Sequence, residues 1–350
     1  MPDSAFVSVI IPARNEEKFI ARCLESFLKQ DYPQHLIEII VVDGMSEDRT
    51  EQIVSEYMTN YSNIKLFKNK RKVTPTALNI GIKNAKGDYI LFAGAHSEIP
   101  PDYVSKCVKY IKEYDADNVG GIVITKPREN TLKGKVIVEL LSHPFGVGGS
   151  KFRVGIDKPA EVDTVPFGCY RREVFEKIGL FNEHLIRNQD IDLNLRLKRA
   201  GGKIMLFPDI SLTYYARSSF WELWKNNFGN GFWVIYASKF SKFPFSLRHL
   251  IPFLFVFFLI CGSILSTISF YILEIFFAVL GLYAILDFLY SLSISRKLKS
   301  FKVFFLLFFG FFSLHISYGL GSFWGALHLH SGLLASLLEI LKRKRIEKRL

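Results

Sequence analysis

Acidic and polar side chains follow two short apolar runs near the N-terminus, at the points where predicted strands end. Asp43 closes the run IEIIVVD and is followed by Asp48, while Arg14, Asn15 and Glu16 follow the run SVIIPA. A carboxylate at a strand tip accepts hydrogen bonds from a base N–H or from ribose hydroxyls, or else it shapes the turn into a helix. Two polar strand ends side by side favour the first interpretation, a nucleoside site.

Short apolar runs alternate with amphipathic segments over about the first hundred residues. The runs have the length of buried strands, and the segments between them have the 3.6-residue period of helices. The expected strands are Val7–Ile11, Ile37–Val42, Ile64–Phe67 and Tyr89–Ala93, with Ser46 as a helix N-cap and a further helix over Thr76–Asn84. This alternation predicts an α/β fold with a doubly wound, mostly parallel sheet, in which ligands bind at the carboxyl ends of the strands.

Apolar residues accumulate after about residue 250. The stretches 251–271, 273–293 and 303–327 are each long enough to cross a hydrocarbon core of about 30 Å. We therefore expect an α/β domain over residues 1–235, followed by a transmembrane helical region over residues 236–350. The first domain would include an aromatic helix from about residue 218, which either packs on that domain or lies in the lipid headgroup layer.

The formal net charge of +12 comes largely from basic residues beside these apolar stretches. No nucleic-acid-binding motif accompanies them, so the charge indicates a cytoplasmic membrane face and not a nucleic-acid partner. Basic clusters at 239–248 and 296–302 agree with two crossings between them. The basic tail at 342–349 conflicts with a third crossing, unless the last apolar segment re-enters or residues 331–341 turn back.

The four cysteines are scattered and predict neither a disulfide framework nor a zinc site. The N-terminus lacks the pattern of a signal peptide, so we expect the first domain to face the cytoplasm.

Several motifs in the expected order give the chain a family resemblance. The segments IPARNEE, VVDGMSEDRT, TALNIGIKNAKGDYILF and NQDIDLNLRLKRAGG resemble the family 2 inverting glycosyltransferases of the GT-A fold. HPFGVGGSKFRVG, DTVPFGCYRREVF and YARSSFWELW are similar to the succinoglycan-biosynthesis-type branch of membrane enzymes, which extend lipid-linked polysaccharide precursors. The match covers about residues 6–235.

The resemblance implies a role for particular residues. The nucleoside of the donor would be held by Pro12, Arg14, Glu16 and Asp43, with Lys72 and Asn79 approaching from the next loop.

In the same way Asp190 would be the general base that deprotonates the acceptor hydroxyl, on the face of the sugar opposite the leaving nucleotide. Alternatively, Asp190 caps a helix over 191–200, and both roles are compatible. Gln189 would orient the base or the acceptor.

One departure from the family concerns the end of the fourth strand. Where the family carries an acidic motif that holds a divalent cation against the donor diphosphate, this chain has Gly94. His96 remains as a ligand for Mn²⁺, whereas Mg²⁺ prefers oxygen ligands. Glu98 would replace the missing carboxylate only if the loop bends. Use of Mn²⁺ or Mg²⁺ is therefore an open expectation.

Basic residues elsewhere suit the acceptor or the diphosphate. Lys151 and Arg153 follow the glycine-rich segment 146–149, which would close over a diphosphate or form a plain solvent loop. Asp163 lies where family members build the acceptor side, and Arg217 would meet a diphosphate or lipid headgroups.

We therefore expect an inverting glycosyltransferase that moves a sugar from a UDP-sugar, or another nucleotide sugar, to a lipid-linked acceptor. It would be a multi-pass protein of the cell membrane with its catalytic domain in the cytoplasm. The alternative is a non-catalytic, nucleotide-sugar-binding membrane subunit, because Gly94 alters the metal motif.

Overall fold

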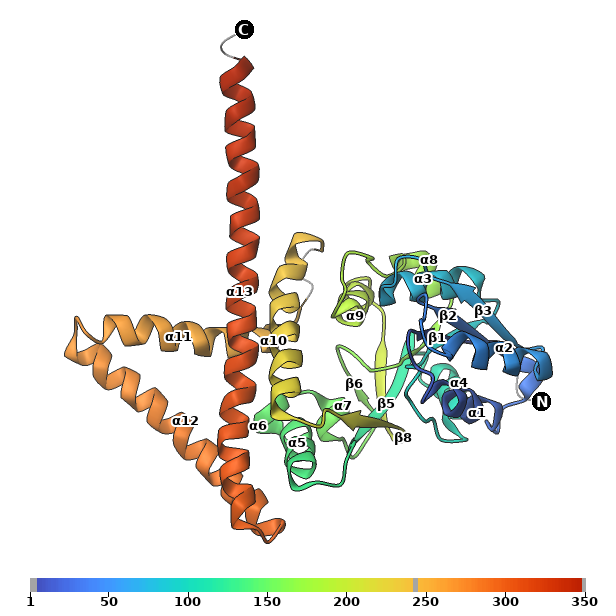
Figure 1. Cartoon of the computed structure of the whole chain (residues 1–350), viewed down its shortest axis with the longest axis horizontal. Coiled ribbons are helices and arrows are strands. Elements are labelled where there is room, and N and C mark those ends of the chain that lie inside the picture. The colour runs from blue at the N-terminus through green and yellow to red at the C-terminus, as the bar shows by residue number, and fades with distance from the viewer. Residues whose placement is uncertain (1–4, 242–244, 348–350) are drawn as a thin grey trace. The chain divides into compact units, whose positions relative to one another are not determined.

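The computed structural model describes residues 5–241 and 245–347, which form two compact units. Unit 1 comprises residues up to Lys126 together with Gly149–Tyr215, and unit 2 comprises Pro127–Gly148 and the chain from Ala216 onward. Figure 1 shows the sheet-containing and the all-helical parts of the chain.

An eight-stranded sheet in the order β3-β2-β1-β4-β7-β5-β8-β6 organises unit 1. The four strands β1 (Val7–Ala13), β2 (Ile37–Asp43), β3 (Ile64–Lys68) and β4 (Tyr89–Phe92) pair in parallel, as the sequence predicts. Antiparallel pairs join β4 to β7 (Cys169–Arg171), β7 to β5 (Asn118–Pro127), and β6 (Ala160–Glu161) to β8 (Ile204–Ala216). The mixed α/β architecture confirms the expected fold class.

Helices cover the sheet because their apolar residues recur along one face. The helices of unit 1 are α1 (Ile20–Leu28), α2 (Thr50–Asn60), α3 (Thr74–Asn84), α4 (Tyr103–Glu113), α7 (Lys151–Val154), α8 (Glu173–Ile178) and α9 (Gln189–Arg199). In α1, Ile20, Cys23, Leu24 and Phe27 are buried, matching the 3.6-residue period in the sequence. Burial of this face against the strands of unit 1 builds the core on which the strand tips are fixed.

The expected N-cap at Ser46 is wrong. Helix α2 begins only at Thr50, with Arg49 in the N-cap position. Asp48 Oδ1 instead accepts hydrogen bonds from the Thr50 backbone N–H at 3.0 Å and from its hydroxyl. Ser46 therefore does not cap the helix and lies in the loop between β2 and α2.

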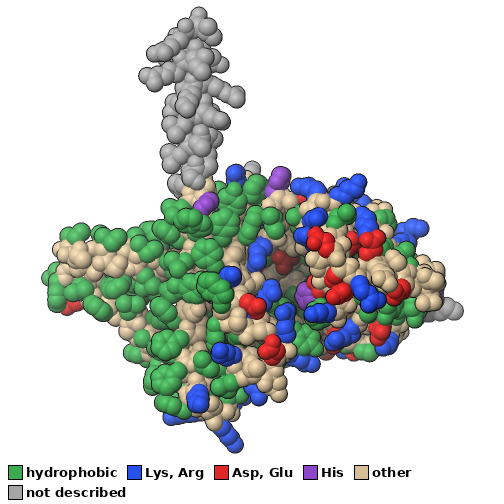
Figure 2. All heavy atoms as spheres, viewed as in Figure 1, with side chains coloured by type: hydrophobic (Ala, Val, Ile, Leu, Met, Phe, Trp, Pro, Cys, Tyr) green, Lys and Arg blue, Asp and Glu red, His purple; other side chains and the backbone are tan. Residues whose placement is uncertain are grey.

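Unit 2 is helical: α5 (Leu132–Ser142), α6 (Pro144–Val147), α10 (Phe220–Tyr236), α11 (Ile251–Leu265), α12 (Phe270–Lys297) and α13 (Phe301–Glu347). Three described segments, Arg248–Leu265, Phe270–Lys297 and Phe301–Leu329, are long and apolar enough to cross a membrane. Figure 2 shows many apolar side chains at the surface of this part of the chain. Large exposed hydrophobic residues, including Phe270, Tyr271 and Phe301, need a nonaqueous environment.

The helix α10 packs along α13, in an arrangement that neither sequence alternative anticipated. Glycines bring the two backbones together: a Cβ on Gly231 would lie 2.0 Å from the Tyr318 carbonyl oxygen, and one on Gly321 would lie 2.0 Å from that of Phe228. Asn227 Nδ2 donates to Ser317 Oγ at 3.0 Å. Contacts through small residues therefore place α10 in the helical unit, whose second segment starts at Ala216.

The C-terminal segment does not turn back. Helix α13 runs without interruption from Phe301 to Glu347 (Figure 1), so neither a re-entrant segment nor a turn within 331–341 resolves the charge conflict of the tail.

Candidate functional site

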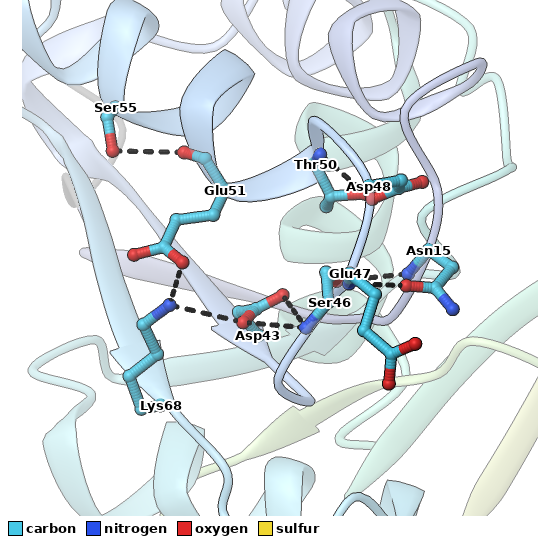
Figure 3. Close-up of polar contacts among 9 residues, drawn as sticks. All are labelled: Asn15, Asp43, Ser46, Glu47, Asp48, Thr50, Glu51, Ser55 and Lys68. Carbon is cyan, nitrogen blue, oxygen red and sulfur yellow. Dashed lines mark hydrogen bonds and ion pairs between the residues drawn. The ribbon is translucent and has the colours of Figure 1, made fainter.

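The tips of β1 and β2 lie side by side, because Ala13 and Asp43 are paired in the parallel ladder. The Asp43 side chain is fully buried and accepts from the Ser46 backbone N–H at 3.2 Å. It also pairs with Lys68 Nζ at 3.3 Å, and Lys68 in turn contacts Glu51 (Figure 3). Asp43 thus shapes the turn at the sheet edge, as one of the two interpretations of the sequence proposed.

The loops after β1 and β2 interlock through Asn15. Its backbone has a positive φ of 56°, its N–H donates to Ser46 Oγ at 3.0 Å, and its Oδ1 accepts from the Glu47 N–H at 2.9 Å (Figure 3). The Glu16 N–H donates to Thr50 Oγ1 at 2.7 Å. Two loops from neighbouring strands therefore form one fixed rim.

The expected donor residues Pro12, Arg14 and Glu16 lie on this rim with Asp43. Pro12 and Glu16 are partly exposed and Arg14 is exposed, so all three are open to a ligand. Arg14 also lies against the turn after β2, since a Cβ added to Gly44 would be 3.2 Å from Arg14 Cβ.

Lys72 and Asn79 differ in their surroundings. Lys72 has a positive φ of 59° and its Nζ lies 3.9 Å from Glu47 Oε1, which places it beside the β2 loop. Asn79 is buried, and its amide is used by Phe181 and Glu183. The structure therefore brings Lys72 to the rim and gives Asn79 a structural contact.

The end of β4 carries Gly94 and His96. A Cβ on Gly94 would lie 3.1 Å from Ser97 Oγ and 3.2 Å from Phe167 Cζ, so the Phe167 ring fills the space beside this glycine. His96 Nδ1 lies 3.4 Å from Glu16 Oε1, and the His96 side chain is 48% exposed. Imidazole and carboxylate thus meet at the junction of the β1 and β4 tips.

The side chains near His96 and Glu16 show how many protein ligands a divalent cation would find at this site. Glu98 does not replace the missing carboxylate, because its Oε1 accepts from Arg22 Nη1 at 2.9 Å. Within the described ranges, no group of three His, Cys, Asp or Glu side chains is placed to hold a metal ion. His96 and Glu16 supply one nitrogen and one oxygen, a donor set that suits Mn²⁺ when further oxygens come from a ligand.

Asp190 lies in the first turn of α9, and the N-cap is Asn188, which has a left-handed backbone. The interpretation of Asp190 as an N-cap is therefore wrong. Asp190 is exposed to solvent, and desolvation by the surrounding protein raises the pKa of its carboxyl. Backbone N–H groups of Asp190 and Ile191 and the positive charge of Arg153 oppose that increase. A carboxylate with a raised pKa is a stronger proton acceptor.

Asn194 ties α9 to the sheet beneath it. Its Oδ1 accepts from the Tyr170 hydroxyl at 2.8 Å and from Asn118 Nδ2 at 3.0 Å, and its Nδ2 donates to Thr164 Oγ1 at 2.8 Å. All of these groups are buried, so the network fixes the helix that carries Asp190. The neighbouring Asp192 is also buried and pairs with Arg196 at 3.0 Å, which is a structural role.

Arg153 is held between two aromatic rings. Its guanidinium carbon lies 5.5 Å from the Phe152 ring centre and 5.3 Å from that of Tyr214. Nη1 is buried without a hydrogen-bond partner, and burial lowers the pKa of the guanidinium. The positive charge of Arg153 acts on Asp190, where it opposes the effect of desolvation on the pKa of the carboxyl.

The residues expected at the acceptor and the diphosphate, apart from Arg153, lie in several different segments of the chain. Lys151 is exposed at the start of α7, while Asp163 and Gln189 are partly exposed in unit 1. Arg217 belongs to unit 2, in the segment before α10. Sequence reasoning did not find Glu183 or Asn194, and the only sequence signal for both is their position near the NQDID motif.

Comparisons with known proteins agree with this fold. Residues 8–179 match the model of glycosyl transferase family 2. The chain is 33% identical over 279 residues to the dolichyl N-acetyl-alpha-D-glucosaminyl phosphate 3-beta-D-2,3-diacetamido-2,3-dideoxy-beta-D-glucuronosyltransferase of Methanococcus voltae, covering 77% of this chain and 85% of the relative. It is 27% identical to the succinoglycan biosynthesis protein ExoA of Rhizobium meliloti, covering 64% of this chain and 67% of that protein.

A solved structure extends the likeness to most of the chain. The mannosyltransferase PcManGT of Pyrobaculum calidifontis, in complex with GDP-Man and Mn²⁺, superposes with a TM-score of 0.59 at 17% identity and covers 93% of this chain and 89% of that one. At this identity the likeness shows the fold alone. The fold and the similarity to these relatives together define a glycosyltransferase of the GT-A fold. The chain belongs to glycosyltransferase family 2, which confirms the predicted family and enzyme class.

Proposed function

We propose that this glycosyltransferase moves a sugar from a nucleotide-sugar donor to a lipid-linked acceptor at a membrane, with inversion at the anomeric carbon. The observation that carries the proposal is the position of Asp190, a solvent-accessible carboxylate with a raised pKa. It lies on a helix fixed to the sheet whose strand tips carry the polar rim.

Asp190 is the general base. It accepts the proton of an acceptor hydroxyl as the oxygen of that hydroxyl attacks the anomeric carbon from the side opposite the nucleotide. The bond from that carbon to the diphosphate oxygen breaks, and the nucleoside diphosphate leaves with the electron pair. A positioned general base contributes about 10²- to 10⁴-fold to the rate.

Pro12, Arg14, Glu16, Asp43 and Lys72 form the donor side. The rim exposes Arg14 and Glu16 to a nucleoside, while Asp43 holds the turn that supports them. Asn79 receives a positioning role here in place of a direct donor contact.

Lys151, Arg153, Asp163 and Gln189, all in unit 1, are assigned to the acceptor and the diphosphate. The positive charges offset negative charge on the leaving group. A UDP-sugar is our proposed donor.

A divalent cation bound beside the donor would be held on the protein side by His96 and Glu16. When bound, it supplies positive charge to the departing nucleotide. Gly94 contributes only its backbone at this position. Removing cations with EDTA and adding back Mn²⁺ or Mg²⁺ to a transfer assay tests this part of the proposal.

The name of the Methanococcus voltae relative supports a dolichyl-type phosphate acceptor. Helices α11, α12 and α13 would anchor the enzyme in the membrane that holds such a lipid. Basic residues that flank them, Arg248 before α11 and Lys297 at the end of α12, support a cytoplasmic catalytic domain.

The test compares Asp190→Asn with the wild-type protein in detergent or nanodiscs, using a panel of nucleotide sugars and a polyprenyl-phosphate-linked sugar. We expect Asp190→Asn to lose at least about 10²-fold in kcat while nucleotide affinity is retained in calorimetry. Asp31→Asn is the matched control, because Asp31 is exposed and precedes the start of β2, whereas the rim lies at the other end of that strand. Retained turnover in Asp190→Asn would reject the assigned base.

The alternative, a non-catalytic nucleotide-sugar-binding subunit, is favoured by the Phe167 ring beside Gly94, where an aspartate would be crowded. It predicts that the wild-type protein binds a donor from the panel and yields no glycosylated lipid, with or without Mn²⁺.

A further inference from the structure

Glu183 joins two segments of unit 1 that are distant in the sequence. It lies in the loop between α8 and α9, and its carboxylate accepts from Thr76 Oγ1 and Asn79 Nδ2, both at 2.9 Å. It also forms an ion pair with Arg71. The three partners come from the start of α3 and the turn before it, about 110 residues away. One carboxylate therefore binds three donors from a single segment.

A second contact lies beside the first. Asn79 Oδ1 accepts from the Phe181 backbone N–H at 2.9 Å, and Asn79 Nδ2 donates to the Phe181 carbonyl oxygen at 2.9 Å. These bonds are buried, and they fix the backbone two residues before Glu183. The loop is thus attached to α3 at two neighbouring points and has little freedom to shift.

Glu183 is charged at neutral pH. The hydrogen bond from Asn79 lowers the pKa of its carboxyl, partial burial opposes this, and Thr76 and Arg71 lower it further. An ionised acceptor forms stronger hydrogen bonds than a neutral one.

The segment that Glu183 holds reaches the donor rim. The Asn69 backbone N–H donates to the Asp43 carbonyl oxygen at 2.7 Å, and the Arg71 N–H donates to Asn69 Oδ1 at 3.1 Å. Lys72 follows directly, with its N–H bonded to the Asn69 carbonyl oxygen at 3.2 Å. A continuous set of hydrogen bonds therefore runs from the tip of β2 to Glu183.

In the C-terminal direction, the chain continues from Glu183 to the proposed base, Asp190. Asp190 lies seven positions after Glu183, and the loop enters α9 through the left-handed Asn188. We propose that Glu183 is a positioning residue that holds the loop entering α9 against the donor-side turn, so that Asp190 and the donor keep one reactive geometry. This inference rests on the function proposed above.

A positioning residue of this kind affects how well the base and the donor sugar are aligned. A misplacement of about 1 Å between reacting groups costs about 10²-fold in rate. Loss of Glu183 leaves β2 and Asp43 in place, because the strand is buried on both faces. We therefore expect kcat to fall while nucleotide affinity stays nearly constant, whereas a purely structural role would lower both with the folded fraction.

The experiment uses the full chain in nanodiscs with donor and lipid-linked acceptor. Glu183→Ala removes all three contacts, Glu183→Gln keeps the shape and loses the charge, and Arg71→Met removes only the partly exposed ion pair. We expect kcat losses of about 30- to 100-fold, about 10-fold and about 2- to 3-fold in that order. UDP affinity should change less than about 3-fold throughout. Glu176→Ala, an exposed residue of α8, is the matched control.

Two results would overturn the inference. One is a wild-type kcat in Glu183→Gln, and the other is a loss of nucleotide binding in parallel with kcat. If Glu183→Ala fails to fold, the kcat values of Glu183→Gln and Arg71→Met test the positioning role. If Asp190→Asn is inactive while Glu183→Gln is unimpaired, only the positioning role fails; if Asp190→Asn retains turnover, the proposed base fails instead.

Discussion

Replacing Arg153 with methionine should shift the pH dependence of transfer. Arg153 faces Asp190 as a desolvated cation, and its charge lowers the pKa of the Asp190 carboxyl against the effect of burial. The buried Tyr170 hydroxyl and the backbone N–H groups of Asp190 and Ile191 also face this carboxyl. Methionine keeps the packing between the Phe152 and Tyr214 rings and removes the charge.

The direction follows from the charges. Arg153 lowers the pKa of the Asp190 carboxyl through its positive charge, without a hydrogen bond from Nη1. Without the cation, Asp190 has a higher pKa and remains protonated to a higher pH. Because the base must be ionised, the acidic limb of the profile moves to higher pH, and activity falls on that limb while it is retained at higher pH.

The assay measures kcat/KM from about pH 5 to about pH 9 for wild type, Arg153→Met and Arg153→Lys. Arg153→Lys preserves the charge and should keep the acidic limb near the wild-type position. An equal fold loss at every pH in Arg153→Met would refute the electrostatic action of Arg153 on Asp190 and leave only its assigned role at the diphosphate.

Three further changes test the packing of the two units, two of them by thermal unfolding and the third by proteolysis. Glu38 is buried, and although burial alone raises the pKa of its carboxyl, hydrogen bonds led by Lys65 bring it below its ordinary value. Glu38→Gln should therefore lower Tm near neutral pH, and the difference from wild type should shrink as the pH falls below about 4. Gly81→Ala should destabilise unit 1 by about 1–3 kcal/mol, because the new Cβ would lie 2.3 Å from the buried Ile10 Cγ2; an unchanged Tm would contradict this. Gly231→Leu should separate α10 from α13, which protease sensitivity of the purified protein would reveal, and intact protection would show that the close backbone contact is dispensable.

Much of the fold could be predicted because its signals are local. Runs such as VSVII and IEIIVV are buried over their whole length, and the structure places strands β1 and β2 there. Burial of every residue in a short run is typical of a central parallel strand, so composition alone identifies it. The apolar stretches after residue 250 were equally clear, and α11, α12 and α13 occupy them.

Loop geometry was harder to predict, as two residues show. Ser46 and Asp190 both had the residue type of an N-cap, yet the caps are Arg49 and Asn188. Helix ends depend on a few competing hydrogen bonds of similar strength. Here Asp48 accepts from the Thr50 N–H at the start of α2, and the left-handed Asn188 precedes α9.

Residue patterns along the chain were enough to predict the family, the order of the first four strands and helices, and the apolar segments, since each is encoded by neighbouring residues. Other contacts are visible only in the folded protein: the hydrogen bond from Asn79 to Glu183, the ion pair of Glu98 with Arg22, and the packing of α10 against α13. These contacts join residues that are about 75 to 105 positions apart. Whether such side chains meet depends on how the elements pack in three dimensions, and no local pattern of residue types carries that information.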